Sequence, residues 1–403
     1  MSLRIIVTGL IGQYPLGGVT WDYFQYVLGL HQLGHDVYYI EDTGVWPYAP
    51  SEDGTVKDCK YNTDYLKDLF ERFGMGDRWA YCFAWKRQWF GLSDAKRREV
   101  IETADLLINV SGMLAKPAEY RGRGRMAYID SDPTFTQVKL AKGYDYFRNV
   151  IDEHDITFSF GEAVASSCSK TPETGHDWIP TRQPMVMSEW PVGDEDRGVF
   201  TTVMNWSAYK PVVYEGRTFG QKDVEFREFF DLPARVAPIE IEIAANAGKG
   251  HKLPKELLVH RGWRLVDPNL VCPDLDSYRD YITTSRGEWS VAKSGYVEGQ
   301  SGWFSCRSTC YLAAGRPVIV QDTGFSEVLP VGKGLLPFRD LDGAVAALES
   351  VESNYDEHRD AARALAEDWF DSAKVLTQLV EGAMSKPDKV VDMPDEPEPQ
   401  SGG

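Results

Sequence analysis

The segment that decides the fold runs from Arg4 to Asp42 and reads RIIVTGLIGQYPLGGVTWDYFQYVLGLHQLGHDVYYIED. It starts with a short β-branched run that ends in glycine, as buried parallel strands do. A glycine-bearing loop follows, and then an amphipathic helix that we expect Thr20 to cap and Gly34 to end. Residues 36–40 return as a second strand. This order predicts a right-handed βαβ unit, the building block of a Rossmann-like domain.

The same alternation of strands and helices continues along the chain and then starts again. Between residues 178 and 197, three prolines and an acidic patch are typical of an inter-domain linker. We therefore predict an α/β fold of two Rossmann-like domains that face each other across a cleft. The predicted units are an N-terminal domain over 1–190, a C-terminal domain over 191–385 that ends in a long amphipathic helix over 362–380, and a disordered acidic tail over 386–403. The strands are predicted at 105–110, 125–129, 156–160, 198–204, 238–243, 264–266 and 317–320.

Composition limits the function classes. The 403 residues carry 43 basic and 61 acidic side chains, a net charge of −18, which disfavours nucleic acid as a partner without excluding a local basic groove. No apolar run reaches the roughly 18 residues of a membrane span, and the start does not have the pattern of a secretion signal. The six cysteines form no CxxC pair, which argues against a zinc ribbon or a disulfide framework. We expect a cytoplasmic protein with reduced thiols.

The densest group of reactive side chains lies between residues 285 and 308. Lys293 and Arg307 could neutralise a diphosphate, and Ser305 or Ser308 could donate hydrogen bonds to it at a predicted helix start. The alternative interpretation of this segment is a serine-capped helix with solvated cations.

Here the motifs resemble a known family. Gly302-x-x-Ser305-x-Arg307-Ser308, then AAGRPVIV over 313–320 and DTGFSE over 322–327, are similar to the donor-binding half of the GT-B glycosyltransferases. Gly17-Gly18, a helix and LGHDV over 33–37 are similar to their first half. The Glu-x7-Glu pair of retaining members is replaced by glycine and cysteine, and the arginine of their Arg-x4-Lys pair by Asn205, so the stereochemistry stays open.

The resemblance implies a transfer of a sugar from a nucleotide-diphosphate donor, such as a UDP-sugar, to an acceptor that could be a small molecule, a glycan or another hydroxyl-bearing compound. No cofactor and no metal are implied. In such a fold the N-terminal domain holds the acceptor and the C-terminal domain holds the nucleotide-sugar. The residues implied to hold the donor and its diphosphate are Gly17, Gly18, Lys210, Lys293, Ser305, Arg307, Ser308, Asp322, Thr323, Gly324 and Glu327. A sugar-nucleotide epimerase or phosphorylase of this fold, and a non-catalytic binding protein, are the alternatives.

An inverting transfer needs a base that removes the acceptor's proton. Asp130 and Asp132 directly follow a predicted strand, where ligands gather in open α/β sheets, and Asp22 on the first helix is a rival. Each has a structural interpretation too, since Asp132 precedes a proline in a turn and an acid in the first turn of a helix is favourable by itself.

Overall fold

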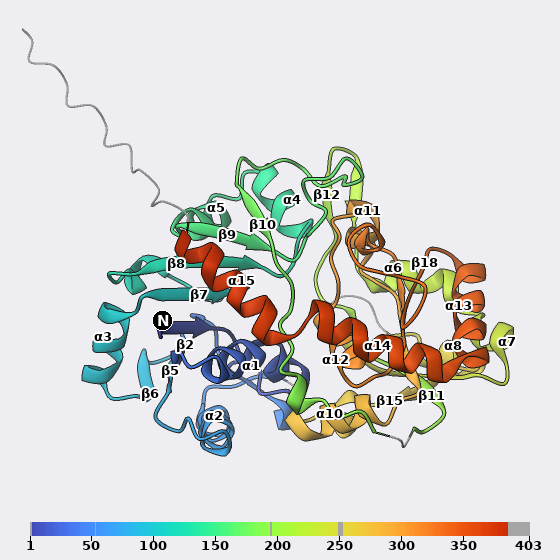
Figure 1. Cartoon of the computed structure of the whole chain (residues 1–403), viewed down its shortest axis with the longest axis horizontal. Helices are drawn as coiled ribbons and strands as arrows, with labels where there is room; N and C mark the ends of the chain where they lie inside the picture. The colour runs from blue at the N-terminus through green and yellow to red at the C-terminus, as the bar shows by residue number, and fades with distance from the viewer. Residues whose placement is uncertain (1, 53, 194–195, 249–252, 386–403) are drawn as a thin grey trace, which may run out of the picture.

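The computed structural model of the chain describes residues 2–52, 54–193, 196–248 and 253–385. Two α/β domains lie side by side, each built on its own sheet (Figure 1). Separate groups of buried side chains cover the two faces of each sheet, as the doubly wound architecture requires. The predicted α/β fold of two Rossmann-like domains is confirmed.

The first sheet has the strand order β10-β9-β8-β7-β1-β2-β5-β6, and all its neighbours are parallel except β5 and β6. In the centre, Ile5 of β1 is paired with Val37 of β2 on one side and with Leu106 of β7 on the other. The strands are β1 (Arg4–Thr8), β2 (Asp36–Glu41), β5 (Trp79–Phe83), β6 (Gln88–Gly91), β7 (Leu106–Val110), β8 (Arg125–Asp130), β9 (Ile156–Ser159) and β10 (Trp178–Pro180). The helices of this domain are α1 (Gly17–Gln32), α2 (Lys60–Arg72), α3 (Asp94–Thr103), α4 (Phe135–Ala141) and α5 (Asp145–Asp152).

The second sheet is fully parallel, with the order β15-β14-β11-β16-β17-β18. Its strands are β11 (Val199–Ser207), β14 (Glu240–Gly248), β15 (Arg264–Val266), β16 (Gly287–Ser290), β17 (Val318–Gln321) and β18 (Leu335–Phe338). Its helices are α6 (Lys222–Glu225), α7 (Leu232–Val236), α8 (Lys255–His260), α9 (Pro268–Val271), α10 (Leu275–Thr283), α11 (Ser294–Gly299), α12 (Cys306–Ala313) and α13 (Leu341–Ser353). Both sheets thus contain the predicted strands, within a few residues at their ends.

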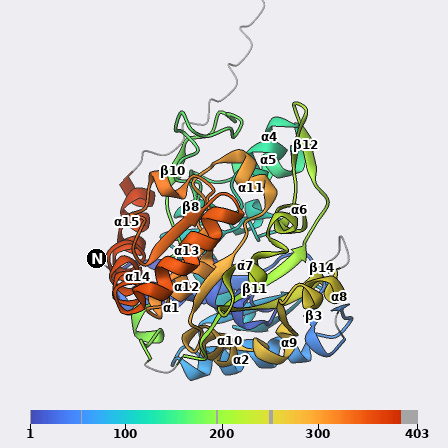
Figure 2. The same ribbon diagram turned by 90° about the vertical axis from the view of Figure 1, so that its right-hand side faces the viewer.

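Two small hairpins lie at the edges of the domains. The first joins β3 (Tyr48–Ala49) to β4 (Gly54–Thr55) in the segment after β2. The second joins β12 (Val212–Tyr214) to β13 (Arg217–Phe219). This second hairpin and α11 reach over to α4 of the first domain (Figure 2).

Helix α1 begins at Gly17, earlier than the cap predicted at Thr20. Leu16 is at the N-cap, and the Thr20 hydroxyl donates a hydrogen bond of 2.9 Å to the Leu16 carbonyl inside the first turn. A Cβ atom on Gly17 would lie 2.1 Å from the Asp274 carbonyl oxygen, just before α10 of the second domain. Glycine at the start of α1 therefore allows the two domains to approach closely.

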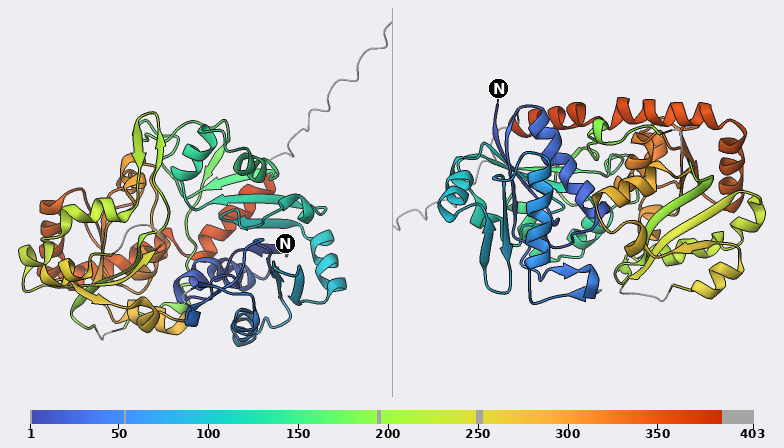
Figure 3. Two further views of the ribbon diagram at one scale, coloured as in Figure 1. Left: turned by 180° about the vertical axis from the view of Figure 1, so that it is seen from behind. Right: turned by 90° about the horizontal axis from the view of Figure 1, so that it is seen from below.

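The end of the described chain returns to the first domain. The pattern over 362–380 predicts one long helix, but the structure has two, α14 (Tyr355–Trp369) and α15 (Ser372–Ser385). Between them, the Met185 backbone N–H donates to the Phe370 carbonyl at 2.7 Å and the Met185 carbonyl accepts from the Ser372 N–H at 2.8 Å, so that a β-bridge from Met185 to Asp371 separates the two helices. Helix α15 then packs against α1 and β8, so that the two C-terminal helices bridge both domains (Figure 3).

Two predictions concern the termini and membranes. The predicted disordered tail over 386–403 lies outside the described residues. Of the helices in the described ranges, none combines the length and the apolar character that a bilayer-crossing segment needs.

Candidate active site

A cavity of about 510 Å³ lies between the two domains and is lined by both. Strand order reverses between β1 and β7 in the first sheet and between β11 and β16 in the second, and ligands of open α/β sheets bind beside such reversals. The lining residues follow this rule, because Ser111 comes directly after β7, Ser131 directly after β8, and Lys293 shortly after β16. The topology of both sheets therefore selects this cavity as the candidate site.

Arg307, in the first turn of α12, is held rigidly in the wall that the second domain contributes. Its Nε donates to Glu288 Oε1 at 2.5 Å, while its two terminal nitrogens donate to the Val203 carbonyl (2.9 Å) and to Ser290 Oγ (3.0 Å). Burial lowers the pKa of Arg307, but the buried carboxylate of Glu288 outweighs this and raises it. Ser305 is at the N-cap of the same helix and also lines the cavity.

Lys222, the first residue of α6, is a site residue that the sequence interpretation missed. It lines the cavity and is only 9 % exposed. Within the described residues, its ammonium group has no hydrogen bond and no ion pair. Burial and the nearby charge of Arg307 lower its pKa, the charge of Glu288 opposes this, and Lys293 lowers it further. Glu288 is already paired with Arg307, so a buried ammonium group with no ion pair of its own is a place where an anion from outside the protein would bind.

Asp132 and Lys293 form an ion pair across the cavity, from one domain to the other. Lys293 Nζ lies 2.9 Å from Asp132 Oδ1, and the Tyr296 hydroxyl donates to the same oxygen. The Tyr209 hydroxyl donates to Oδ2 at 2.9 Å. Burial would raise the pKa of Asp132, but Lys293 and Tyr296 hold it below its usual value. Both carboxylate oxygens already accept hydrogen bonds, which makes Asp132 a poor acceptor for a further proton.

Asp22 faces the same cavity with its carboxylate unpaired. Its side chain has no hydrogen bond and no ion pair within the described residues, although its backbone carbonyl accepts a hydrogen bond of 3.0 Å from Gln183. Burial raises the pKa of Asp22 to about 7, against the opposing charge of Arg307. A carboxylate with this pKa is matched to proton transfer near neutral pH, which is what a general base requires.

Beside Asp22, the wall from the first domain is a row of hydroxyl groups. The Tyr23 hydroxyl lies 3.2 Å from Ser111 Oγ, and Ser111 Oγ lies 2.6 Å from Ser131 Oγ. The three side chains come from α1 and from the loops after β7 and β8. The two walls of the cavity therefore differ in chemistry: one offers a carboxylate and hydroxyls, the other offers cations.

The predicted glycines and the third predicted acid have separate roles. Gly18 lines the cavity, whereas Gly17 is packed against the segment before α10 and does not. Asp130 is buried behind the cavity wall, where it accepts hydrogen bonds from Thr136 (2.6 Å) and Gln137 (2.9 Å) and stabilises the loop. The expectation that Asp130 is a base facing the acceptor is therefore corrected, because its carboxylate is buried and hydrogen-bonded.

Several predicted donor residues lie outside the cavity. They are Lys210, Ser308, Asp322, Thr323, Gly324 and Glu327. Lys210 and Glu327 are exposed on the surface. Asp322 uses its carboxylate on its own turn, accepting from the Gly324 N–H at 3.0 Å and from Ser326 Oγ at 2.9 Å. Ser308 and Thr323 line a separate recess of about 20 Å³.

Across the described ranges, no group of three or more His, Cys, Asp or Glu side chains is placed to hold a metal ion. Positive charge in the cavity comes from Lys222, Lys293 and Arg307.

Comparison with solved structures shows the fold. Anabaena HepE in complex with UDP and glucose is 11 % identical, with a TM-score of 0.55, over 94 % of this chain and 99 % of that one. An alpha-glucosyltransferase in complex with UDP and a 13-mer DNA is 11 % identical, with a TM-score of 0.58, over 95 % and 99 %. Sucrose-phosphate synthase from Thermosynechococcus elongatus is 13 % identical, with a TM-score of 0.53, over 94 % and 98 %. The chain has the two-domain GT-B fold of these enzymes, as its motifs predicted.

Comparison by sequence adds nothing to this. No protein-family model matches the chain, and the search of the curated proteins gives no match.

Proposed function

We propose that the chain is a glycosyltransferase that moves a hexosyl or other glycosyl group from a UDP-sugar to a hydroxyl-bearing acceptor. The observation that carries the proposal is one cavity that Lys222 lines from the second domain and Asp22 from the first, each without a hydrogen bond or ion pair to its charged group in the described residues. The similar structures support the donor, because HepE and the alpha-glucosyltransferase both hold UDP.

The second domain binds the donor. Lys222, Lys293 and Arg307 surround the space that the diphosphate would fill, and charge-assisted hydrogen bonds from such cations are the strong ones. When the bond between the sugar and the diphosphate breaks, UDP leaves with the electron pair of that bond. The three cations stabilise the charge that develops on the departing phosphate oxygen.

The first domain activates the acceptor. The Asp22 carboxylate takes the proton of the acceptor hydroxyl while the acceptor oxygen bonds to the anomeric carbon of the sugar. Asp22 ends the step protonated, and a pKa near 7 lets it return that proton to solvent. The hydroxyls of Tyr23, Ser111 and Ser131 lie beside it to orient the acceptor.

The proposal includes transfer without a metal or a cofactor. Three cationic side chains in one cavity supply the charge that a divalent ion would otherwise supply at the diphosphate. Activity is then expected to survive treatment with EDTA. Loss of turnover in EDTA that Mg²⁺ restores would contradict this part of the proposal.

Donor binding is the first test. Thermal shift and calorimetry with UDP, GDP, ADP and TDP should show selective stabilisation by UDP, since a ligand at about 100 times its dissociation constant adds roughly 2.7 kcal/mol of stability. Lys222→Ala should abolish most of the shift, whereas Lys210→Ala, an exposed lysine outside the cavity, should keep it.

Turnover is the second test. Release of UDP from UDP-glucose and other UDP-sugars is measured with water and with a panel of acceptors, in the parent and in Asp22→Asn. Transfer or hydrolysis that needs Asp22 supports the transferase. Conversion of the donor sugar without release of UDP would identify an epimerase instead, and UDP binding without any turnover would identify a binding protein.

A further inference from the structure

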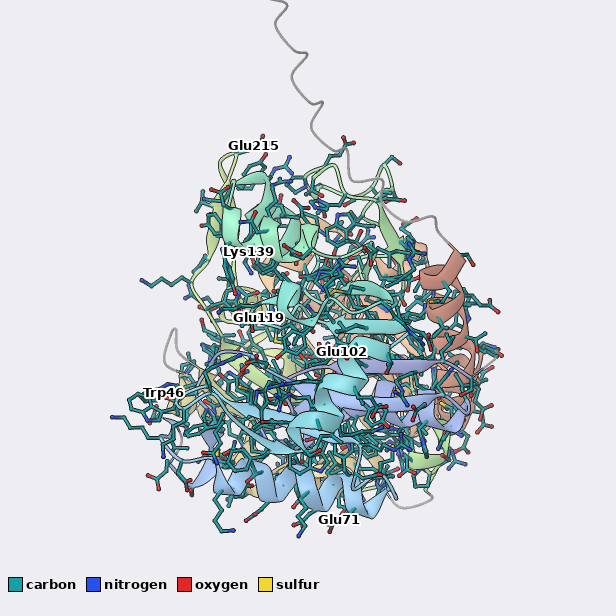
Figure 4. All side chains as sticks on the ribbon, turned by 90° about the vertical axis from the view of Figure 1, so that its left-hand side faces the viewer. Trp46, Glu71, Glu102, Glu119, Lys139 and Glu215 are labelled. Carbon is teal, nitrogen blue, oxygen red and sulfur yellow. The ribbon has the colours of Figure 1, made fainter. Side chains whose placement is uncertain are left out.

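Two tryptophans stand next to each other at the carboxyl edge of the first sheet. Trp46 lies in the segment after β2, and Trp85 lies in the turn between β5 and β6, so the pairing of β2 with β5 brings them together. Their ring centroids are 4.6 Å apart with the planes at 86°, and Trp85 is 49 % exposed. Figure 4 shows Trp46 projecting from the edge of the molecule opposite the C-terminal helix. Trp46 is half-buried, and tryptophan rings that stay partly in water are costly and mark contact surfaces.

The chain places these rings next to a residue of the cavity. Tyr48, two residues after Trp46, lines the cavity and packs against Tyr14 with the ring centroids 5.6 Å apart. The Tyr48 backbone is fixed, because its N–H donates to the Gln13 carbonyl at 2.8 Å and its carbonyl accepts from Asn62 at 2.9 Å. We call the four side chains Tyr14, Tyr48, Trp46 and Trp85 the aromatic edge. One of its residues, Tyr48, lines the cavity, and another, Trp85, is exposed on the outer surface.

The chemistry of this path suits a sugar chain better than a lipid or a nucleic acid. Aromatic ring faces pack on the C–H faces of sugar rings, and the hydroxyl row of Tyr23, Ser111 and Ser131 inside the cavity can exchange hydrogen bonds with sugar hydroxyls. The Nζ atom of Lys57 lies 5.5 Å from the Trp46 ring centroid and 5.2 Å from the Trp85 ring centroid. This ammonium group can bind sugar hydroxyls, whereas the aliphatic tail of a lipid has no group to pair with it. A net charge of −18 works against a nucleic-acid chain.

We propose that the aromatic edge binds an oligosaccharide acceptor, with the sugar units stacked along Tyr48, Trp46 and Trp85 and the terminal hydroxyl directed to Asp22. The inference rests on the proposed function, since it names the acceptor of that same site. The aromatic edge supplies length-dependent affinity, while the chemistry stays inside the cavity.

The experiment uses the full chain on an immobilised glycan array in the presence of UDP. The parent and the variants Trp85→Ala and Trp46→Ala are compared with Trp369→Ala, a tryptophan on α14 that packs on Arg182. We expect the parent to retain one class of oligosaccharide, and each edge variant to lose about threefold to tenfold in affinity for it. The Trp369→Ala variant should keep that affinity, and all four proteins should bind UDP equally.

A second measurement separates the edge from the cavity. The retained oligosaccharide and its terminal monosaccharide are used as acceptors with the UDP-sugar that is turned over. Trp85→Ala should raise the KM for the oligosaccharide and leave kcat and the KM for the monosaccharide unchanged.

Failure of this inference is distinct from failure of the proposed function. A parent that binds UDP and releases it from UDP-sugars, but retains no glycan or retains it equally in the edge variants, overturns the aromatic edge alone. A parent that binds no UDP overturns the transferase, whatever the array shows.

Discussion

The two walls of the cavity differ in the sign of their charges, yet each wall combines ion-paired groups with one unpaired group. On the first-domain wall, Asp132 is tied to Lys293 and two tyrosines, whereas Asp22 has no partner within the described residues. On the second-domain wall, Arg307 is tied to Glu288, whereas Lys222 has none. Unpaired charges in a semi-buried site lower the stability of the folded protein. The difference indicates that Asp132 and Glu288 hold their partner cations in place, whereas Asp22 and Lys222 keep their charged groups free for the substrates.

The largest expected effect is that of Asp22→Asn. Loss of the base should lower turnover about 10²–10⁴-fold while the affinity for UDP stays unchanged, because Asp22 acts on the acceptor. In the parent, kcat/KM should rise with pH through about 7, since only the ionised carboxylate accepts the proton and the pKa of Asp22 is raised to about 7. In Asp22→Asn this rise should disappear. A variant that kept the pH profile of the parent would remove Asp22 from the mechanism.

Lys222→Ala tests the unpaired group of the other wall. Loss of a charge-assisted contact with the diphosphate should weaken UDP binding by about 1–3 kcal/mol, and should affect uridine far less. Because the pKa of Lys222 is lowered, the affinity of the parent for UDP should fall as the pH rises and the ammonium group loses its proton. Calorimetry over a pH series measures both effects. Equal affinity of Lys222→Ala and Lys210→Ala would show that the diphosphate binds elsewhere.

How far the sequence predicts the fold depends on the kind of signal. Short β-branched runs closed by glycine specify strands well, because a buried parallel strand needs little besides continuous apolar residues, and the second strand was placed within a residue. The helix start at Gly17 was missed, because its reason is a contact with Asp274 in the other domain. Contacts between distant segments leave no periodic pattern in a sequence.

The site shows the same limit more sharply. Motif spacing selected Lys210, which is exposed, while the cavity contains Lys222, and the β12–β13 hairpin lies between the two in the chain. No local signal at Lys222 distinguishes it from a surface lysine, since its burial comes from tertiary packing. The prediction that Asp322 contacts the donor fails for the opposite reason. The motif is present, but the Asp322 carboxylate accepts hydrogen bonds within its own turn. Ser305 and Arg307 are predicted because they lie at a helix start, and Lys293 because it is a second cation in the same segment.

Asp132→Asn tests whether the paired carboxylate only builds the site. Turnover should stay within about tenfold of the parent, because the base is Asp22. The free energy of unfolding should fall by about 1–3 kcal/mol, since Lys293 loses its carboxylate partner and two tyrosines lose a charged acceptor. Urea unfolding and UDP-release assays on the same preparation measure both. Turnover reduced a hundredfold or more with normal UDP affinity would restore Asp132 as the base.

The smallest measured change is a shift of Tm by a few degrees, and here the two carboxylates should act in opposite directions. The pKa of Asp22 is raised from 3.8 to about 7, so the folded state holds its proton over a range in which the unfolded chain has released it. The stability cost of ionised Asp22 therefore grows as the pH rises from about 4 and is complete above about 7. Asp22→Asn removes this cost, and should be more stable than the parent by about 4 kcal/mol at pH 8, a few degrees in Tm for a chain of this length, with a smaller gain at pH 5. Asp132→Asn, whose parent carboxyl has a lowered pKa, should instead be destabilised at pH 8. If both variants shifted Tm in the same direction at pH 8, the contrast between an unpaired and a paired carboxylate would be wrong.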